Sequence, residues 1–377
     1  MLRNMLGIYV HVPFCSSRCS YCDFATNVYD EDLVRRYVVA LGGELEAAAL
    51  YVGEARADTL YLGGGTPPVL GAEGLGRILT AAANHFPVAP GAEVTCEANP
   101  ETLSPEILDA LAAAGVNRLS LGMQTFDAAT LTILGRRHEP TEAEDAYWRA
   151  RAKGFDNVSL DMMYGLPGQE RRGWAADLRR ALALKPEHVS IYALTLEADV
   201  ELFRERAAYV FPGDDEQAAM YYDALELLAA GGLVQYEISN FARPGRECRH
   251  NLKYWRDEEY LGFGPSAASH WRRGRYRNPR ELDEYFAEAA TGRWPLANPE
   301  PSDPYREMRT AAVLGLRLTA GLDAAAFEER TGVNPKVYYK NELAELAGTG
   351  LVTVDGDNVR LSRRGLFLSD EVFSRLI

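Results

Sequence analysis

Residues 8–22 read IYVHVPFCSSRCSYC. Residues 8–12 are β-branched or aromatic, which predicts a strand, and Cys15, Cys19 and Cys22 follow in the loop after it. A [4Fe–4S] cluster is held by cysteine thiolates that lie close together, and a compact loop of this kind supplies them. Three thiolates leave one iron open to bind a small molecule. The alternatives are a zinc site completed by His11 and three unlinked core cysteines.

The composition is that of a globular protein without disulfide staples. The chain has 377 residues, of which 47% are hydrophobic and 25% are charged. Its five cysteines are an odd number, which argues against a disulfide framework and for metal or redox chemistry. No run of about 18 apolar residues predicts a membrane span, and too few residues precede the first strand for a signal peptide. We therefore expect a cytoplasmic protein.

The charge balance argues against nucleic acid as a partner. The net charge is −14, whereas nucleic-acid binders usually present a basic face. The segment 243–280 is a local exception, with ten Arg or Lys residues against four Asp or Glu residues. This segment can meet an anionic ligand, but it can equally be a solvated face or a partner site.

Strand-like and helical runs alternate along the first half of the chain. This pattern predicts a parallel sheet with crossover helices, in an α/β fold of the partial (β/α)6 barrel type. The chemistry of such folds lies at the carboxyl ends of the strands. The six predicted strands are 8–12, 59–62, 93–97, 118–122, 157–162 and 188–194.

The rhythm changes near residue 301. Helical runs at 305–318, 323–330 and 335–346 precede a hairpin whose turn contains Asp355-Gly356. We therefore predict one domain over residues 1–300 and a small winged-helix-like domain over 301–377. Such a domain can bind DNA, but the negative charge favours a lid or docking role.

The cysteine spacing, with Tyr21 before the third cysteine, resembles that of the radical S-adenosylmethionine (SAM) superfamily. The run from Tyr9 to Cys15 is similar to its oxygen-independent coproporphyrinogen dehydrogenase branch, and the resemblance covers essentially the whole chain. It implies a [4Fe–4S] cluster on Cys15, Cys19 and Cys22 and an electron donor for that cluster. It also implies that the amino and carboxyl groups of SAM chelate the open iron, and that reduction cleaves SAM to a 5′-deoxyadenosyl radical.

The resemblance also assigns a SAM pocket. Gly63-Gly-Gly-Thr-Pro67 matches the glycine motif of the family, and glycine lets the main chain approach a ligand closely. Taken singly, each feature has a plainer explanation: the glycine run as a tight turn, Arg136 as a solvated arginine and Asp161 as a capping aspartate. The positions that match SAM contacts are Tyr9, Tyr21, Gly64, Gly65, Thr66, Glu97, Gln124, Arg136 and Asp161.

Within the branch, the chain resembles the shorter group of heme chaperones, HemW. Phe24 stands where the dehydrogenases have a fourth cysteine, and the chain begins only a few residues before its first strand. Residues 250–255, HNLKYW, match the His-Asn-x-x-Tyr-Trp motif of HemW. Imidazole is a common axial ligand of heme iron, so His250 is the candidate heme contact, and Cys248 lies two residues away. A hydrogen-bonded structural histidine carries about equal weight.

The function implied by the resemblance is that of a heme chaperone. Such a protein binds the cluster, SAM and heme, and passes heme to an acceptor protein whose identity the sequence does not reveal. The segment 243–280 would then meet the heme propionates. The alternative is an oxygen-independent coproporphyrinogen III dehydrogenase, which decarboxylates propionates by radical chemistry.

Overall fold

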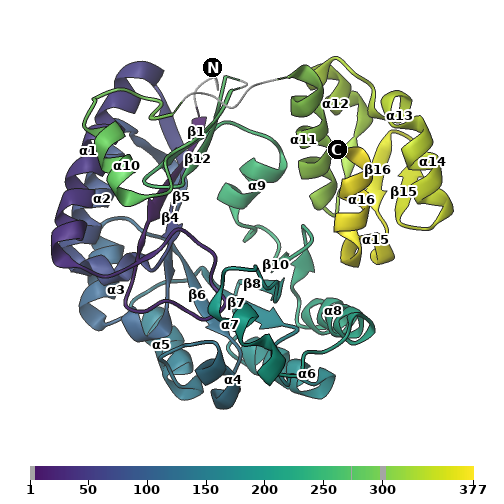
Figure 1. The fold of residues 1–377 in the computed structure, drawn as a ribbon, viewed down its shortest axis with the longest axis horizontal. Coiled ribbons are helices and arrows are strands. Elements are labelled where there is room, and N and C mark those ends of the chain that lie inside the picture. Colours follow the sequence, from purple (N-terminus) through teal and green to yellow (C-terminus); the bar gives the residue numbers. More distant parts are fainter. Residues whose placement is uncertain (1–4, 273, 298–302) are drawn as a thin grey trace.

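The computed structural model describes residues 5–272, 274–297 and 303–377 (Figure 1). Six parallel strands form its centre, and all six predicted strands are confirmed. Their side chains are almost continuously buried, as expected for parallel strands covered on both faces. In both chain order and spatial order they are β1 (Met5–Val12), β4 (Arg56–Gly64), β5 (Val88–Ala98), β6 (Arg118–Gln124), β7 (Val158–Tyr164) and β8 (His188–Ala193).

Helices connect these strands and cover the outer face of the sheet (Figure 1). The side chain of Asp30 accepts a hydrogen bond from the Leu33 amide and caps the first helix, while Ser104 caps α3 in the same way. The crossover helices are α1 (Glu31–Val52), α2 (Gly71–His85), α3 (Pro105–Ala113), α4 (Ala128–Ile133), α5 (Pro140–Ala152) and α6 (Arg171–Ala183). A further helix, α8 (Asp214–Ala230), follows the sixth strand and packs on α6.

Short strands that the sequence did not predict extend the sheet at both edges. β11 (Tyr260–Phe263) pairs in parallel with β1, and β12 (Ala268–Trp271) and β13 (Gly274–Arg277) follow in antiparallel order. At the other edge, β10 (Asn240–Ala242) and β9 (Val234–Gln235) pair antiparallel beyond β8. In the described ranges the sheet has eleven strands and ends at β13 and β9, so the barrel is open as predicted.

The helix α9 (Arg249–Trp255), which carries the HNLKYW motif, lies on the face of the sheet opposite α1 (Figure 1). The remaining short elements of this domain are β2 (Phe14–Cys15), β3 (Asn27–Val28), α7 (Glu201–Arg204) and α10 (Leu282–Ala289). None of the helices in the described part of the chain is both long and apolar enough to cross a bilayer.

The C-terminal domain has its own hydrophobic core. The first two predicted helices and the hairpin are present, the third predicted helix, 335–346, is divided into two helices at Tyr339, and a third strand and two further helices are added. The elements are α11 (Pro304–Arg317), β14 (Leu322–Asp323), α12 (Ala324–Thr331), α13 (Pro335–Tyr338), α14 (Lys340–Gly348), β15 (Val352–Asp355), β16 (Asn358–Leu361), α15 (Arg363–Phe367) and α16 (Ser369–Leu376). The domain boundary predicted at residue 300 lies outside the described residues.

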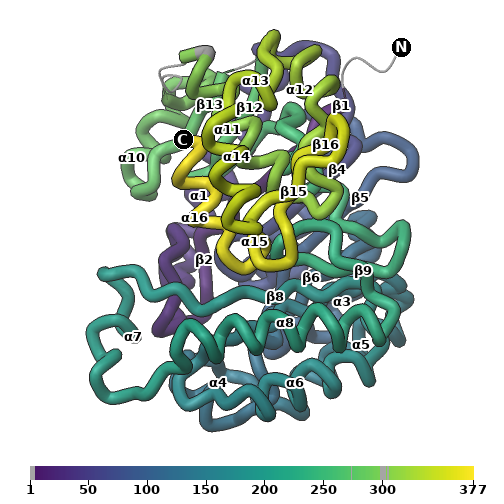
Figure 2. The backbone as a smooth tube through the Cα atoms, turned by 90° about the vertical axis from the view of Figure 1, so that its right-hand side faces the viewer, coloured from purple at the N-terminus to yellow at the C-terminus, as the bar shows by residue number. Residues whose placement is uncertain are grey.

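The C-terminal domain packs against α9 through α11, and Figure 2 shows this domain in front of the barrel strands. The Arg317 guanidinium lies 4.3 Å from the centre of the Trp255 ring and forms an ion pair with the buried carboxylate of Glu237. Arg330 donates a hydrogen bond of 2.7 Å to the carbonyl oxygen of Arg256. The end of the motif helix is therefore held between the two domains.

Candidate functional site

The three cysteines of the first loop lie at the carboxyl end of β1. Cys15 is in β2, Cys19 and Cys22 follow it, and all three are half-buried free thiols. The loop is anchored because the Ser20 hydroxyl donates to the carbonyl of Ile133 at 2.8 Å. Burial, together with smaller effects of the nearby thiols of Cys19 and Cys22, raises the pKa of Cys15 to about 11. The three sulfurs of the loop therefore lie close enough for the charge of one to affect another.

A single metal ion requires its ligands to be gathered more tightly than a cluster does. In the part of the chain that the structure describes, no three His, Cys, Asp or Glu side chains are gathered as around one ion. A [4Fe–4S] cluster takes each cysteine on a different iron, so its ligands lie farther apart than those of one ion. The His11 ring is hydrogen-bonded at both nitrogens, to the Tyr9 hydroxyl at 3.0 Å and the Ala25 carbonyl at 3.0 Å. His11 is thus engaged in the protein and does not complete a zinc site here.

A chain of hydrogen bonds links two of the cysteines. The Thr66 hydroxyl donates to Cys15 Sγ at 3.5 Å, and Asn99 Nδ2 donates to Thr66 Oγ1 at 3.3 Å. Arg136 donates from Nη2 to Asn99 Oδ1 at 2.8 Å and from Nη1 to Cys19 Sγ at 3.8 Å. Donors aimed at sulfur stabilise the thiolate form that binds iron. The structure therefore places Thr66 and Arg136 beside the cysteines and adds Asn99, which sequence reasoning missed.

The glycine run packs directly against the cysteine loop. Gly64 has a φ of +105°, and a Cβ there would lie 2.5 Å from the His11 ring. A Cβ on Gly65 would lie 2.5 Å from the carbonyl oxygen of Phe14. The packing of the protein itself therefore requires both glycines, and their contact with a ligand stays a prediction.

Two carboxylates lie close to this run. Glu97 accepts hydrogen bonds from the Tyr61 hydroxyl at 2.7 Å and from the Gly64 amide at 3.0 Å. Burial, together with a smaller effect of the charge of Asp161, raises the pKa of Glu97 to about 7. Asp161 accepts hydrogen bonds from the Ser120 hydroxyl at 3.2 and 3.0 Å, and burial raises its pKa too. The positive charge of the buried Arg118 acts on both carboxyls, and a cationic ligand beside them stays a prediction.

Gln124 and Tyr21, two further residues of the predicted pocket, have different surroundings. Gln124 ends β6 with a φ of +65°, and its amide and the Arg136 guanidinium both approach Gly122. Tyr21 packs on a small apolar cluster that includes Leu134, and burial raises its pKa. The strand predicted over 157–162 was expected to end next to Asp161, but β7 continues to Tyr164. Asp161 therefore lies deeper in the barrel than the cysteines.

His250 lies apart from the cysteine loop, in a buried position on α9. Its Nδ1 is hydrogen-bonded to the Thr59 hydroxyl and its Nε2 to the Tyr254 hydroxyl, both at 2.8 Å. Only 1% of its surface is exposed, and burial lowers its pKa to about 3, so the ring is neutral. In this arrangement neither ring nitrogen is free for a heme iron. The structure has the features of the structural histidine that sequence reasoning kept as the alternative.

The residues around His250 form a polar end of the barrel. The Glu93 carboxylate accepts from the His250 and Arg249 amides at 3.0 Å each and caps the start of α9. It also accepts a hydrogen bond of 3.6 Å from the fully buried thiol of Cys248, whose pKa burial raises to about 12. Cys248 therefore faces the protein interior here and not an open heme pocket.

Comparison with known proteins fixes the family. A model of the radical SAM superfamily matches residues 9–181, and a model of the HemN C-terminal domain matches residues 303–368. The chain is 35% identical to "Heme chaperone HemW" of Lactococcus lactis, over 100% of this chain and 98% of that protein. It is 38% identical to the Mycobacterium tuberculosis protein of the same name, over 98% of this chain and 94% of that one. The chain belongs to the HemW family of radical SAM proteins.

The fold of this HemW family member is that of a solved relative. The structure of coproporphyrinogen III oxidase (HemN) from Escherichia coli superposes with a TM-score of 0.86 over 100% of this chain and 91% of that one, at 24% identity. This likeness confirms the predicted fold, including the small C-terminal domain, and at this identity it carries no argument about activity.

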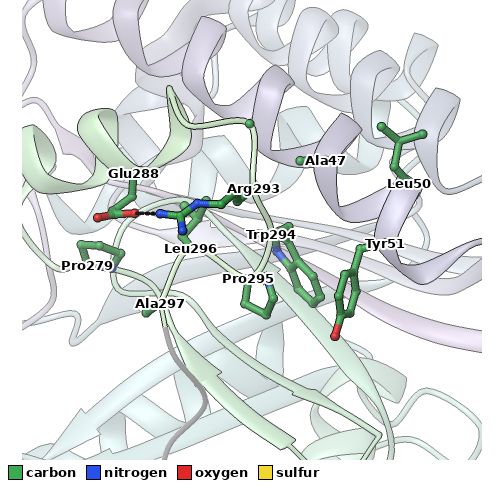
Figure 3. Close-up of a pocket in the computed structure, with 11 residues that line it drawn as sticks. Ala47, Leu50, Tyr51, Pro279, Glu288, Arg293, Trp294, Pro295, Leu296 and Ala297 are labelled. Atoms are coloured by element: carbon green, nitrogen blue, oxygen red, sulfur yellow. Dashed lines mark ion pairs between the residues drawn. The ribbon is translucent and has the colours of Figure 1, made fainter.

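A separate cavity lies beside α1 (Figure 3). It has a volume of about 800 Å³ between α1 and the segment after α10, and the rings of Tyr51 and Trp294 meet there at 5.5 Å. No predicted site residue lines this cavity.

Sequence reasoning missed Asn99, Tyr61 and Thr59. Alternation along β4 places Thr59 and Tyr61 on the same face of the strand, so this pair could have been connected with the glycine run that follows. Asn99 stands two residues after Glu97 in a Glu-Ala-Asn-Pro run, and this spacing was the available signal.

Proposed function

We propose that this chain is a heme chaperone that holds one [4Fe–4S] cluster and SAM at the carboxyl ends of the strands and delivers heme to an acceptor protein. The observation that carries the proposal is likeness over the whole chain to relatives named heme chaperones, at 35% and 38% identity. Phe24, at the position of the fourth cysteine of the dehydrogenases, is 65% exposed and adds support.

The residues of the loop support the cluster and SAM. Cys15, Cys19 and Cys22 are the proposed cluster ligands, with Thr66 and Arg136 donating hydrogen bonds to two of the sulfurs. When bound, the cluster supplies an iron for the amino and carboxyl groups of SAM and the electron that cleaves SAM. Glu97 and Asp161 provide the negative charge that a sulfonium requires. Tyr9, Tyr21, Gly64, Gly65 and Gln124 complete the proposed pocket.

His250 remains the proposed heme contact, with a condition that the structure adds. For Nε2 to bind iron, the hydroxyl of Tyr254 has to leave it, and α9 has to become accessible. The C-terminal domain covers this helix through Arg317 and Arg330, so heme capture requires the two domains to separate locally. The acceptor protein, the electron donor and the cytoplasmic location stay predictions.

Two assays test the proposal. Anaerobic titration of the reconstituted protein with heme is expected to give a shifted Soret band, and the binding is expected to weaken in His250→Ala. Incubation with SAM, reductant and coproporphyrinogen III is expected to yield no protoporphyrinogen. The absence of heme binding would overturn the chaperone function, and turnover of coproporphyrinogen would establish the alternative.

A further inference from the structure

Tyr61 touches both of the sites that the sequence predicts. Its hydroxyl donates a hydrogen bond of 2.7 Å to Glu97 Oε1 in the proposed SAM pocket. Its ring is stacked on the imidazole of His250, with centroids 5.2 Å apart and an angle of 29° between the planes. One side chain of β4 therefore connects the HNLKYW helix with the carboxylate nearest the glycine run.

His250 is held firmly enough to orient that ring. Thr59 binds one of its nitrogens and Tyr254 the other. The ring of Tyr9 packs near both groups, with its centroid 6.1 Å from that of Tyr61 and 6.3 Å from that of the imidazole. With Thr59 and Tyr61 on the same strand face, the hydrogen bond that fixes the imidazole also fixes the surface on which Tyr61 packs.

The two oxygens of Glu97 are held in different ways. Oε2 accepts from the backbone amide of Gly64, which belongs to the rigid end of β4. Oε1 accepts from Tyr61, whose position depends on a neighbour in α9. A movement of α9 can therefore change one of the two hydrogen bonds that orient the carboxylate and leave the other intact.

We propose that Tyr61 is a positioning residue that couples the state of His250 to the affinity of the pocket for SAM. When His250 leaves its place, Tyr61 loses its stacking partner, its hydroxyl moves away from Glu97, and SAM binds less tightly. The inference rests on the proposed function, because it takes SAM as the ligand near Glu97 and heme as the ligand that displaces His250. Coupling between two sites is reciprocal, so bound SAM weakens heme capture by the same factor.

A double-mutant cycle tests this coupling without heme. SAM is titrated anaerobically into reconstituted wild type, Tyr61→Phe, His250→Ala and the double variant, and binding is followed by the EPR spectrum of the reduced cluster. Each single change is expected to weaken SAM binding by about tenfold or more, as for the loss of one hydrogen bond to a charged group. The double variant is expected to bind no more weakly than Tyr61→Phe alone.

Two results overturn the coupling: SAM affinity unchanged in His250→Ala, or a double variant as weak as the product of the two single effects. The exposed Tyr51, on the outer helix α1, provides the matched control, because Tyr51→Phe is expected to leave SAM binding unchanged. If His250→Ala does not fold, Thr59→Val removes one hydrogen bond from the same ring and replaces it in the cycle. Wild-type protein that binds no SAM contradicts the proposed function itself, whereas intact binding with additive effects contradicts only the coupling.

Discussion

The acidity of Glu97 leads to a prediction about SAM binding. Burial raises the pKa of Glu97 to about 7, so the carboxyl is largely protonated at pH 6 and largely ionised at pH 8. The sulfonium and ammonium groups of SAM are cationic and favour the ionised form. SAM therefore binds with full affinity above the raised pKa of Glu97, and this affinity is lost as the pH falls through that pKa. Between pH 8 and pH 6 the ionised fraction falls by about tenfold, and the dissociation constant of SAM is expected to rise by about the same factor.

The assay is SAM titration of the reconstituted, reduced protein at several pH values, followed by the EPR spectrum of the cluster. In Glu97→Gln the pH dependence is expected to disappear and the affinity to stay near its low-pH value. Glu44 provides a control, because burial raises its pKa to about 7 as well, although it lies between α1 and α10. Glu44→Gln should keep the wild-type profile. A flat profile in wild type, or an unchanged profile in Glu97→Gln, would refute the reasoning.

Three further changes test other parts of the account. Asn99→Ala removes the amide that orients Thr66 and Arg136, so fewer hydrogen-bond donors reach the sulfurs. The reduction potential of the cluster is therefore expected to become more negative in a redox titration. An unchanged potential would contradict this. Tyr254→Phe frees Nε2 of His250 and is expected to tighten heme binding in a Soret titration, whereas weaker binding would argue against Nε2 as the ligand. Glu44→Gln removes a buried carboxyl whose pKa is raised. In the wild type, ionisation of this carboxyl lowers the free energy of unfolding by about 3 kcal/mol as the pH rises from 4.5 to above 7. Thermal unfolding should show wild type losing stability over that range relative to the variant; parallel curves would contradict the buried position of this group.

The sequence predicted the centre of the fold well, because parallel strands leave strong local signals. Each of the six central strands is a nearly continuous buried run, and caps such as Asp30 and Ser104 mark the helices between them. The strands β9 to β13 have only two to four residues each. Such runs carry little periodicity, and β11 pairs with β1 from a segment about 250 residues away, so local patterns could not reveal them.

The candidate site was predicted in part, and the limits have a physical cause. Cys15, Thr66, Glu97 and Arg136 could be grouped because the carboxyl ends of parallel strands share one edge. The partner of His250 could not be foreseen, because Thr59 is 191 residues away and the contact depends on how α9 enters the barrel. The glycine run shows the same limit. Its spacing suggested a ligand, whereas the atoms closest to Gly64 belong to His11.

The central claim is that three thiolates of one loop hold a cluster with an open iron for SAM. The most direct measurement is the iron content of anaerobically reconstituted protein, combined with its EPR spectrum before and after SAM is added. We predict about four irons per chain and a signal of the reduced cluster that changes with SAM. Zinc in place of iron, or a cluster whose signal stays the same at saturating SAM, would contradict the claim.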